Sequence, residues 1–177
     1  MRLTLYITVV VLLSACTRFD AVVDTNGSSH NLENQPVVLM WLAPDCPLCQ
    51  TYSTEFVRMA DSFPDLQFLG VLPGNLYSKE EVNHFVDSFQ FDKPILVDAD
   101  FKLTKKMGVT TTPEFLVLDN NLSIRYQGKF DDWATALAQK KPKPTEHYFK
   151  DALTSFMAGE TIKTQYTEPL GCLIEFD

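Results

Sequence analysis

The sequence predicts one α/β domain, a layered sandwich built around a mixed β-sheet. Short apolar runs alternate along the chain with segments whose apolar residues recur at helical spacing, as in strand–helix–strand units. Two later apolar runs are separated only by Asn120-Asn121, which indicates an antiparallel hairpin. The length of 177 residues is sufficient for a single domain with a substantial core.

The first half of the domain is expected to alternate two strands with two helices. The apolar run between Pro36 and Pro44 is short and begins with β-branched residues, which favours a buried central strand. Ser78 and Glu81 have the spacing of a capping box, which predicts that a helix begins there. The expected elements are a strand at 37–42, a helix at 49–63, a strand at 66–72 and a helix from Ser78 to Phe89.

The second half is expected to add a hairpin and a closing helix. Gly108 follows a brief helical segment and is a candidate C-cap. The Asn120-Asn121 pair tolerates the left-handed backbone of a tight turn, so the strands on either side should be antiparallel neighbours. The expected elements are a strand at 94–97, a helix at 101–107, strands at 115–119 and 122–127, a helix at 145–157 and an extended tail at 160–177.

The N-terminus has the pattern of an export signal. Arg2 precedes an apolar run at 3–13, which is too short to span a bilayer. Leu13-Ser14-Ala15-Cys16 resembles the lipobox of bacterial lipoproteins. The resemblance implies that residues 1–15 are removed and that Cys16 carries the lipid; the alternative is an ordinary signal peptide that leaves Cys16 as a thiol.

The residues that follow are expected to hold the domain away from a membrane. Residues 16–35 are mostly polar and are predicted to form a tether. Thr17 rather than Asp follows Cys16, which in lipoproteins of the enterobacterial type indicates the outer membrane. The predicted location is therefore the bacterial cell envelope, with the chain anchored in the lipid bilayer and its domain in the periplasm.

Composition excludes several classes of function. There are 15 Lys and Arg against 23 Asp and Glu, a formal charge of -8 without a basic stripe, so nucleic acid is not an expected partner. No Gly-rich phosphate loop is present, and the three histidines are too widely spaced for a metal-ligand pattern. We therefore expect neither a cofactor nor a metal.

The motif Cys46-Pro47-Leu48-Cys49 carries the chemistry that we expect. It lies where the first strand meets the first helix, so Cys46 should cap a helix whose unpaired N–H groups stabilise a thiolate. Cys49, one turn further in, should be less exposed and act as the resolving thiol. A structural disulfide or half of a zinc site are the alternatives, but zinc needs two more ligands and the sequence offers no second pair.

A longer stretch around this motif resembles a known family. Trp41-Leu42-Ala43-Pro44-Asp45-Cys46-Pro47-Leu48-Cys49, with Thr112-Pro113-Glu114-Phe115-Leu116-Val117-Leu118-Asp119 further on, is similar to the thioredoxin-like superfamily. More narrowly, it resembles bacterial membrane-attached thiol-disulfide oxidoreductases and AhpC/TSA-like redoxin-domain proteins. The similarity covers about residues 32–140. It implies a three-layer sandwich over 36–140, with residues 141–177 as a helix and a cysteine-containing tail packed on it.

The resemblance also implies a substrate site. Pro113 is the candidate for a cis-proline beside the redox cysteines, which leaves backbone groups of Thr112 free to pair with an incoming peptide. We expect Trp41, Pro44 and Leu48 to complete the docking surface around the disulfide.

The C-terminal tail carries a further cysteine. Gly171-Cys172-Leu173-Ile174 resembles the ending of one branch of redoxin-domain proteins. Cys172 is either a third redox thiol or a small apolar residue that docks the tail.

The predicted activity is a lipid-anchored thiol-disulfide oxidoreductase that exchanges its disulfide with exported protein thiols. A reducing role would need a membrane electron donor, whereas an oxidising role would not. Asp45 opposes thiolate formation at Cys46, and Met40 stands where thioredoxins bury an acid, which leaves Glu55 and Asp98 as substitute proton acceptors.

Two other functions remain as alternatives. A peroxiredoxin-like peroxidase would place Thr or Ser three residues before its reactive cysteine and Pro seven before, whereas Ala43 and Leu39 stand there. A Cu(I)-binding protein of the same fold could use the two thiolates. Its copper-delivery relatives, however, have a CxxxC spacing and a distant histidine that this sequence lacks.

Overall fold

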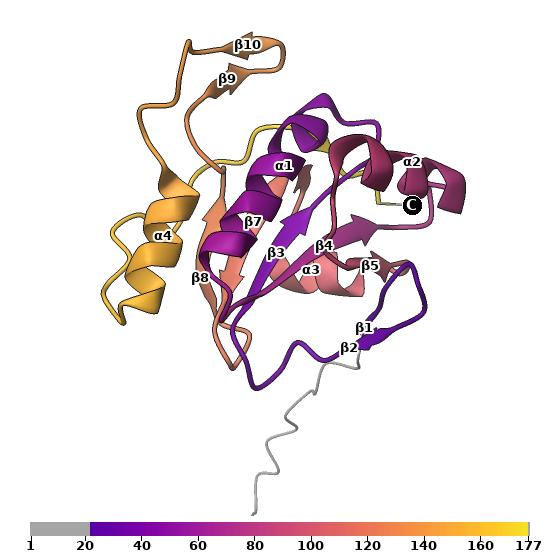
Figure 1. Cartoon of the computed structure of the whole chain (residues 1–177), viewed down its shortest axis with the longest axis horizontal. Coiled ribbons are helices and arrows are strands. Elements are labelled where there is room, and N and C mark those ends of the chain that lie inside the picture. The colour runs from indigo at the N-terminus through magenta and orange to yellow at the C-terminus, as the bar shows by residue number, and fades with distance from the viewer. Residues whose placement is uncertain (1–21, 177) are drawn as a thin grey trace, which may run out of the picture.

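The computed structural model describes residues 22–176 (Figure 1). The predicted signal peptide at 1–15 and the predicted lipid-bearing Cys16 lie outside these residues. Over 22–176, no helix has both the length and the apolar character that crossing a membrane requires.

A five-stranded sheet forms the centre of the domain, in the order β5-β4-β3-β7-β8. The central strand pairs in parallel with β4 and antiparallel with β7, so the sheet is mixed, as predicted. The hairpin of β7 and β8 is antiparallel, also as predicted. The strands are β3 (Val37–Trp41), β4 (Gln67–Pro73), β5 (Ile95–Asp98), β7 (Glu114–Leu118) and β8 (Ile124–Gly128).

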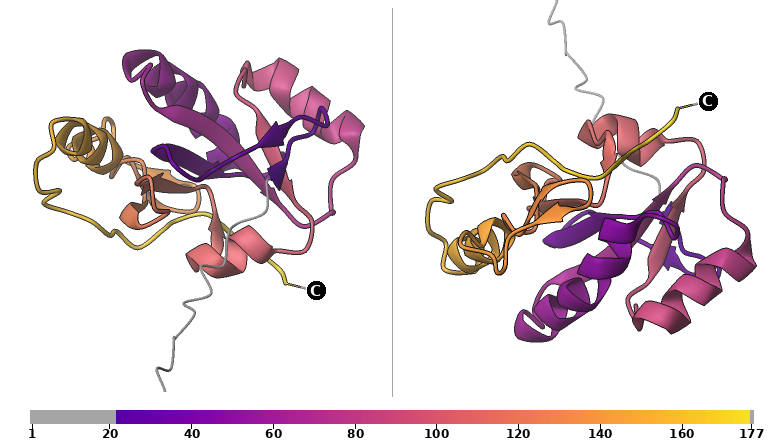
Figure 2. Two further views of the ribbon diagram at one scale, coloured as in Figure 1. Left: turned by 90° about the horizontal axis from the view of Figure 1, so that it is seen from below. Right: turned by 90° about the horizontal axis from the view of Figure 1, so that it is seen from above.

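Helices cover both faces of this sheet and give the predicted three layers (Figure 2). Residues of α1, α2 and α4 belong to the core on one face, and residues of α3 belong to the core on the other. The helices are α1 (Pro47–Ser62), α2 (Lys79–Phe89), α3 (Lys102–Met107) and α4 (Tyr148–Met157).

The alternation of side chains along β3 divides the core in two. Val38 and Met40 face α1, whereas Leu39 and Trp41 face α3, and all are fully buried. Burial on both faces explains why this strand reads as a continuous apolar run. On the α1 side, the ring of Phe56 packs against Phe68 of β4 and Phe115 of β7, which fixes the helix against the sheet.

Both helix caps predicted from the sequence are present, and the predicted β7–β8 turn differs only in detail. The capping box of Ser78 and Glu81 begins α2, and Gly108 caps α3 in a left-handed conformation. The hairpin between β7 and β8 differs in detail, because its left-handed residue is Leu122 rather than either asparagine. The Asp119 carboxylate holds this turn by accepting the backbone N–H groups of Asn121 and Ser123.

Residues 22–35 pack on the domain instead of forming the predicted tether. A hairpin of β1 (Val22–Val23) and β2 (Ser29–His30) lies beside β5, and Leu32 is buried. Asp24 fixes the hairpin, since it accepts the backbone N–H groups of Asn26 and Ser28. The polar composition of this segment therefore reflects a tight turn and not a flexible spacer.

The C-terminal third also contains elements that were not expected. A hairpin of β9 (Ala134–Ala136) and β10 (Gln139–Lys140) precedes α4. The extended tail after α4 crosses one end of the sheet towards α3, as the yellow segment of Figure 2 shows. There β11 (Cys172–Leu173) pairs antiparallel with β6 (Thr111–Thr112).

Candidate redox site

The two cysteines of the CxxC motif lie at the beginning of α1. Cys46 is the N-cap residue, and Pro47 begins the helix, where its missing N–H leaves no partner unsatisfied. Cys46 is only 2% exposed and Cys49 is fully buried. Both are free thiols in this structure. The sequence thus positions a pair of sulfurs between the end of β3 and the first turn of a helix.

The surroundings of Cys46 stabilise its thiolate. A hydrogen bond from the Cys49 thiol, with further ones from the Cys172 thiol and the backbone N–H groups of Cys49 and Leu48, lowers the pKa of Cys46 to about 5. Burial acts in the opposite direction but is outweighed. The N–H groups are those that a helix N-terminus leaves unpaired. Of the two sulfurs, Cys46 is therefore the one that is ionised at neutral pH.

Cys49 has the opposite character. Burial raises its pKa well above the ordinary value, and its hydrogen bond to Cys46 adds to the effect. The backbone N–H of Ala43 donates to Cys49 Sγ over 3.4 Å. A thiolate at Cys46 beside a protonated thiol at Cys49 is the division that attack and resolution require.

The Thr112–Pro113 peptide bond is cis, as the family resemblance implies, and it lies against the cysteines. The Thr112 carbonyl oxygen is 3.3 Å from Cys46 Sγ and accepts a hydrogen bond from the protonated thiol. Thr112 and Pro113 are both buried. The structure therefore brings together the four residues at 46, 49, 112 and 113 that sequence reasoning assigned to one site.

The backbone of Thr112, expected to be free for a peptide, is occupied by the chain's own tail. Cys172 lies opposite Thr112 in the pairing of β11 with β6. Its Sγ is 2.9 Å from Cys46 Sγ, and its side chain is half-buried. Cys172 thus contacts the redox pair and also packs against the core on the α1 side, so both interpretations offered for it stay open.

The structure does not place Trp41 at this site. Its side chain lies on the α3 face of the sheet, fully buried, where the indole N–H donates to Thr104 Oγ1 over 2.9 Å. Trp41 is therefore a core residue, and the expectation that it lines a docking surface is corrected. Pro44 is buried as well, whereas Leu48 is half-exposed beside the cysteines.

The two acids considered as proton acceptors are engaged elsewhere. Glu55 is half-exposed and pairs with Arg58. Asp98 accepts the backbone N–H groups of Leu103 and Thr104, and so begins α3.

A buried acid, Glu114, lies directly after Pro113 and was not among the predicted site residues. It is 1% exposed, accepts a hydrogen bond from Gln127 Nε2 over 2.6 Å, and has a pKa raised by burial. An acidic residue at the start of an otherwise apolar strand was the signal that could have identified it.

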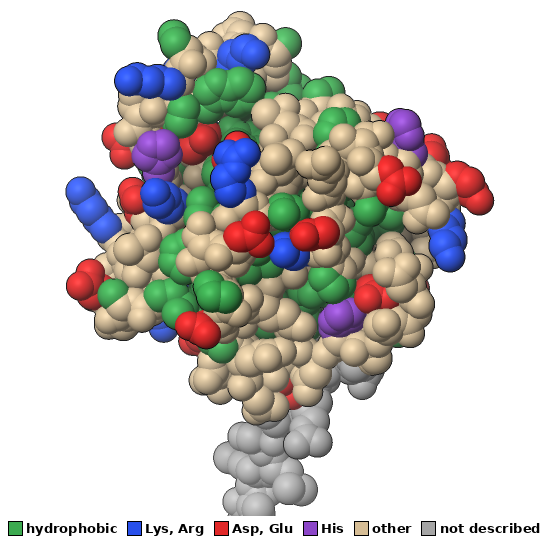
Figure 3. All heavy atoms as spheres, viewed as in Figure 1, with side chains coloured by type: hydrophobic (Ala, Val, Ile, Leu, Met, Phe, Trp, Pro, Cys, Tyr) green, Lys and Arg blue, Asp and Glu red, His purple; other side chains and the backbone are tan. Residues whose placement is uncertain are grey.

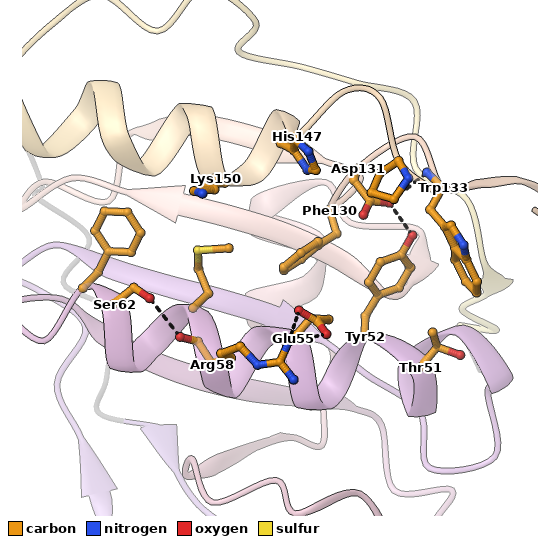
Figure 4. A pocket seen from close by; sticks show the side chains of 13 residues that line it. Thr51, Tyr52, Glu55, Arg58, Ser62, Phe130, Asp131, Trp133, His147 and Lys150 are labelled. Atoms are coloured by element: carbon orange, nitrogen blue, oxygen red, sulfur yellow. Dashed lines mark hydrogen bonds and ion pairs between the residues drawn. The ribbon is translucent and has the colours of Figure 1, made fainter. Parts of the chain in front are cut away.

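One cavity is separate from the cysteines. About 590 Å³ in volume, it lies between α1 and α4, and Tyr52, Glu55 and Arg58 of α1 face His147 and Lys150 across it (Figure 4). Tyr52 donates to the Asp131 carboxylate at its wall. No cysteine lines it. Acidic and basic side chains alternate with hydrophobic ones over this face of the molecule (Figure 3).

A smaller cavity of about 290 Å³ adjoins the redox site. It lies between the segment after β4 and the C-terminal tail, and Leu76 and Leu173 beside it are among the exposed large hydrophobic residues. Its charged lining residues are both acidic, Asp45 and Glu175. Among residues 22–176, no three histidine, cysteine or acidic side chains gather in a metal-binding group.

Comparison with known proteins places this geometry in context. The model of the AhpC/TSA family matches residues 17–127. No curated protein sequence matches the chain significantly. An uncharacterized conserved protein from Geobacillus kaustophilus is structurally similar, with a TM-score of 0.74 and 21% identity over 89% of this chain and 88% of that chain.

Two oxidoreductases share the fold at lower similarity. A secreted Mycobacterium tuberculosis disulfide oxidoreductase homologous to E. coli DsbE gives a TM-score of 0.56 and 19% identity over 82% of this chain and 98% of that chain. The thioredoxin domain of a Bacteroides vulgatus thiol-disulfide oxidoreductase gives a TM-score of 0.56 and 12% identity over 77% and 91%. The fold is thioredoxin-like, as predicted.

Proposed function

The chain belongs to the AhpC/TSA family, and from this premise we propose that it is a thiol-disulfide oxidoreductase in which Cys46 attacks and Cys49 resolves. The observation that carries the proposal is the pairing of the two sulfurs at the beginning of α1. Cys46 is stabilised as a thiolate, while Cys49 is held as a buried thiol beside it. The thioredoxin-like oxidoreductases that share the fold support the same chemistry.

The reaction follows from these protonation states. The Cys46 thiolate attacks one sulfur of a protein disulfide, that S–S bond breaks, and the departing sulfur takes the electron pair and a proton. The Cys49 thiol then loses its proton and attacks Cys46 Sγ. The mixed disulfide breaks, the second substrate thiol leaves, and a Cys46–Cys49 disulfide remains. The same steps in reverse oxidise a substrate dithiol.

The low pKa of Cys46 favours the oxidising direction. A stabilised thiolate stabilises the reduced form of the enzyme, which makes its disulfide a stronger oxidant. In this direction no membrane electron donor is needed to reduce the Cys46–Cys49 pair. The substrates are exported proteins with cysteine pairs.

We place the protein at the cell envelope, anchored through a lipid on Cys16. The apolar segment at 3–13 and the lipobox-like sequence that ends at Cys16 support this location. Metabolic labelling with an alkyne fatty acid tests it: label on the wild-type chain that disappears in Cys16→Ser supports the anchor. Equal labelling of both chains contradicts it.

Peroxide reduction receives less support from the site. Ala43 stands where a peroxidase has a hydroxyl group to orient peroxide, and its N–H is directed to Cys49 Sγ. Cys46 is also covered, at 2% exposure.

Equilibration of the chain in glutathione redox buffers tests the activity. A Cys16→Ser background leaves three cysteines, and mass spectrometry after acid quenching reports the state of each. We expect the Cys46–Cys49 pair to cycle with the buffer between dithiol and disulfide, the dithiol reducing a protein disulfide and the disulfide oxidising a protein dithiol. Cys46→Ser, which is similar in size, should abolish turnover. Failure of Cys46 and Cys49 to interconvert, also in the Cys172→Ser background, would overturn the proposal.

A further inference from the structure

The C-terminal tail is fixed to the domain at several points. Ile162 is 4% exposed within the core on the α1 side. Thr167 is held by two hydrogen bonds. Its backbone N–H donates to the carbonyl oxygen of Gln127 in β8, and its Oγ1 accepts the backbone N–H of Lys129, the residue directly after β8. The ring of Phe176 packs against Phe101. The tail is therefore an ordered part of the fold up to the redox site and beyond it.

The tail approaches the cis-proline loop so closely that only glycine fits. A Cβ on Gly171 would lie 2.0 Å from the Thr112 carbonyl oxygen. After this contact, Cys172 pairs opposite Thr112, and the Ile174 N–H donates to the Thr110 carbonyl over 2.9 Å. Gly171 thus allows an extended strand to lie directly on the loop.

This strand holds a cysteine at the reactive sulfur. Cys172 Sγ lies 2.9 Å from Cys46 Sγ, a separation that a small rotation converts into bonding distance. Cys46 itself is nearly inaccessible under this cover, whereas Cys172 is half-buried. A strand pairing with an exposed edge, with its side chains in neighbouring pockets, is one of the recurring ways in which domains bind extended peptides.

We propose that the C-terminal tail is a tethered substrate: its strand occupies the place of an extended protein substrate, and Cys172 exchanges disulfides with Cys46. The inference rests on the proposed function and adds a third redox thiol and a gate to it. A protein substrate reaches Cys46 only after it displaces the strand at 171–174.

The exchange balances without an external oxidant. In the oxidised enzyme, the Cys172 thiol loses its proton and its sulfur attacks Cys46 Sγ. The Cys46–Cys49 bond breaks, and the Cys49 sulfur takes the electron pair and a proton. The product has a Cys46–Cys172 disulfide and a Cys49 thiol, which burial keeps protonated. One disulfide has moved within the chain.

The first test removes the competing thiol. The full chain carrying Cys16→Ser and Cys49→Ser is equilibrated with reduced and oxidised glutathione, quenched in acid and mapped by mass spectrometry. We expect the Cys46–Cys172 disulfide to exceed the glutathione adduct of Cys46, because the strand presents Cys172 at high effective concentration. A dominant glutathione adduct on Cys46, with Cys172 free, would overturn the inference.

The second test moves the strand without touching a sulfur. In the same background, Gly171→Ala should lower the ratio of internal disulfide to glutathione adduct at least about tenfold, because its methyl group displaces the strand. Gly27→Ala controls for a general loss of stability, since its φ of +85° strains any side chain, while its Cβ meets nothing within 4 Å in the remote β1–β2 turn. An unchanged ratio in Gly171→Ala would show that strand pairing does not present Cys172.

The gate is tested on the enzyme with its Cys46–Cys49 pair intact. Gly171→Ala should accelerate the reaction of Cys46 with a protein disulfide more than its reaction with oxidised glutathione. Equal acceleration of both would contradict the gate. Cycling of Cys46 and Cys49 without any Cys46–Cys172 disulfide would refute this inference and leave the proposed function standing. Absence of both disulfides would refute both.

Discussion

The carbonyl oxygen of Thr112 lies 3.3 Å from Cys46 Sγ, so the residue before the cis-proline touches the sulfur at the head of α1. The two residues are far apart in the sequence but share one polar environment. When Cys46 is protonated, the Thr112 oxygen accepts its hydrogen. When Cys46 is ionised, the thiols of Cys49 and Cys172 donate to it instead. The redox sulfur thus has partners in both protonation states.

The ionisation of Cys46 gives the first prediction. Its rate of alkylation by iodoacetamide should rise with pH to a midpoint near its pKa of about 5. Cys49→Ala should move the midpoint upward, because the strongest donor to the thiolate is lost, and Cys172→Ala should move it less. A wild-type midpoint above about 8, as for an ordinary thiol, would contradict this.

The same ionisation should make the stability of the reduced protein depend on pH. The pKa of Cys46 is depressed in the folded state, so its stabilising contribution is fully present above the unfolded pKa of about 8.5. That contribution is lost as the pH falls towards 5. Urea unfolding of the reduced wild type and of Cys46→Ala should therefore show a difference in unfolding free energy that increases from pH 5 to pH 8. A difference independent of pH would count against a stabilised thiolate.

The reduction potential should be more oxidising than that of thioredoxin. Because the reduced form is stabilised by the Cys46 thiolate, we expect the Cys46–Cys49 couple to lie above the thioredoxin value of roughly -270 mV. Equilibration of Cys172→Ser with glutathione or dithiothreitol measures this couple without the third thiol. A potential at or below the thioredoxin value would favour a reductase that requires a membrane donor.

Substitutions at Trp41 and Leu48 should have different effects: one should lower the stability of the fold, and the other should weaken substrate binding. Trp41→Phe removes the hydrogen bond to Thr104 and should cost about 1–3 kcal/mol of unfolding free energy without changing the Cys46–Cys49 exchange rate. Leu48→Lys, at a half-exposed position beside the cysteines, should leave stability nearly unchanged and slow exchange with a protein substrate. Thermal unfolding and turnover measured on both variants decide the point. The reverse pattern would restore Trp41 to the docking surface.

Much of the fold follows from local sequence patterns. The run around Val38 predicted a buried strand because that strand is covered on both faces, and the capping box at Ser78 predicted the beginning of α2 because it satisfies N–H groups locally. The β1–β2 hairpin was missed, since its strands have two residues each and depend on tertiary contact with β5. Short pairings of this kind leave almost no periodic signal.

Some residues of the site could likewise be predicted from a local motif, whereas others depend on contacts between residues far apart in the sequence. The CxxC motif defines its position by sequence alone, and the family resemblance adds Pro113. Trp41 was misassigned because side chains alternate along β3, so Trp41 lies on the α3 face of the sheet and its neighbour Met40 on the α1 face. The contact of Cys172 with Cys46 joins positions that no local pattern relates, and it required the course of the whole tail.

The packing of residues 22–35 on the sheet would limit the distance between the domain and a membrane to which Cys16 is anchored, as proposed. With a lipid on Cys16, as proposed, the chain from there to Val22 can span at most about 20 Å. The β1–β2 hairpin lies low in Figure 1, whereas the first turn of α1 lies at the opposite end of the domain. Such an enzyme would act within a thin layer next to the bilayer, with the cysteine site at the end of the domain away from the membrane. Its substrates would be proteins that pass through that layer, and not proteins embedded in the lipid.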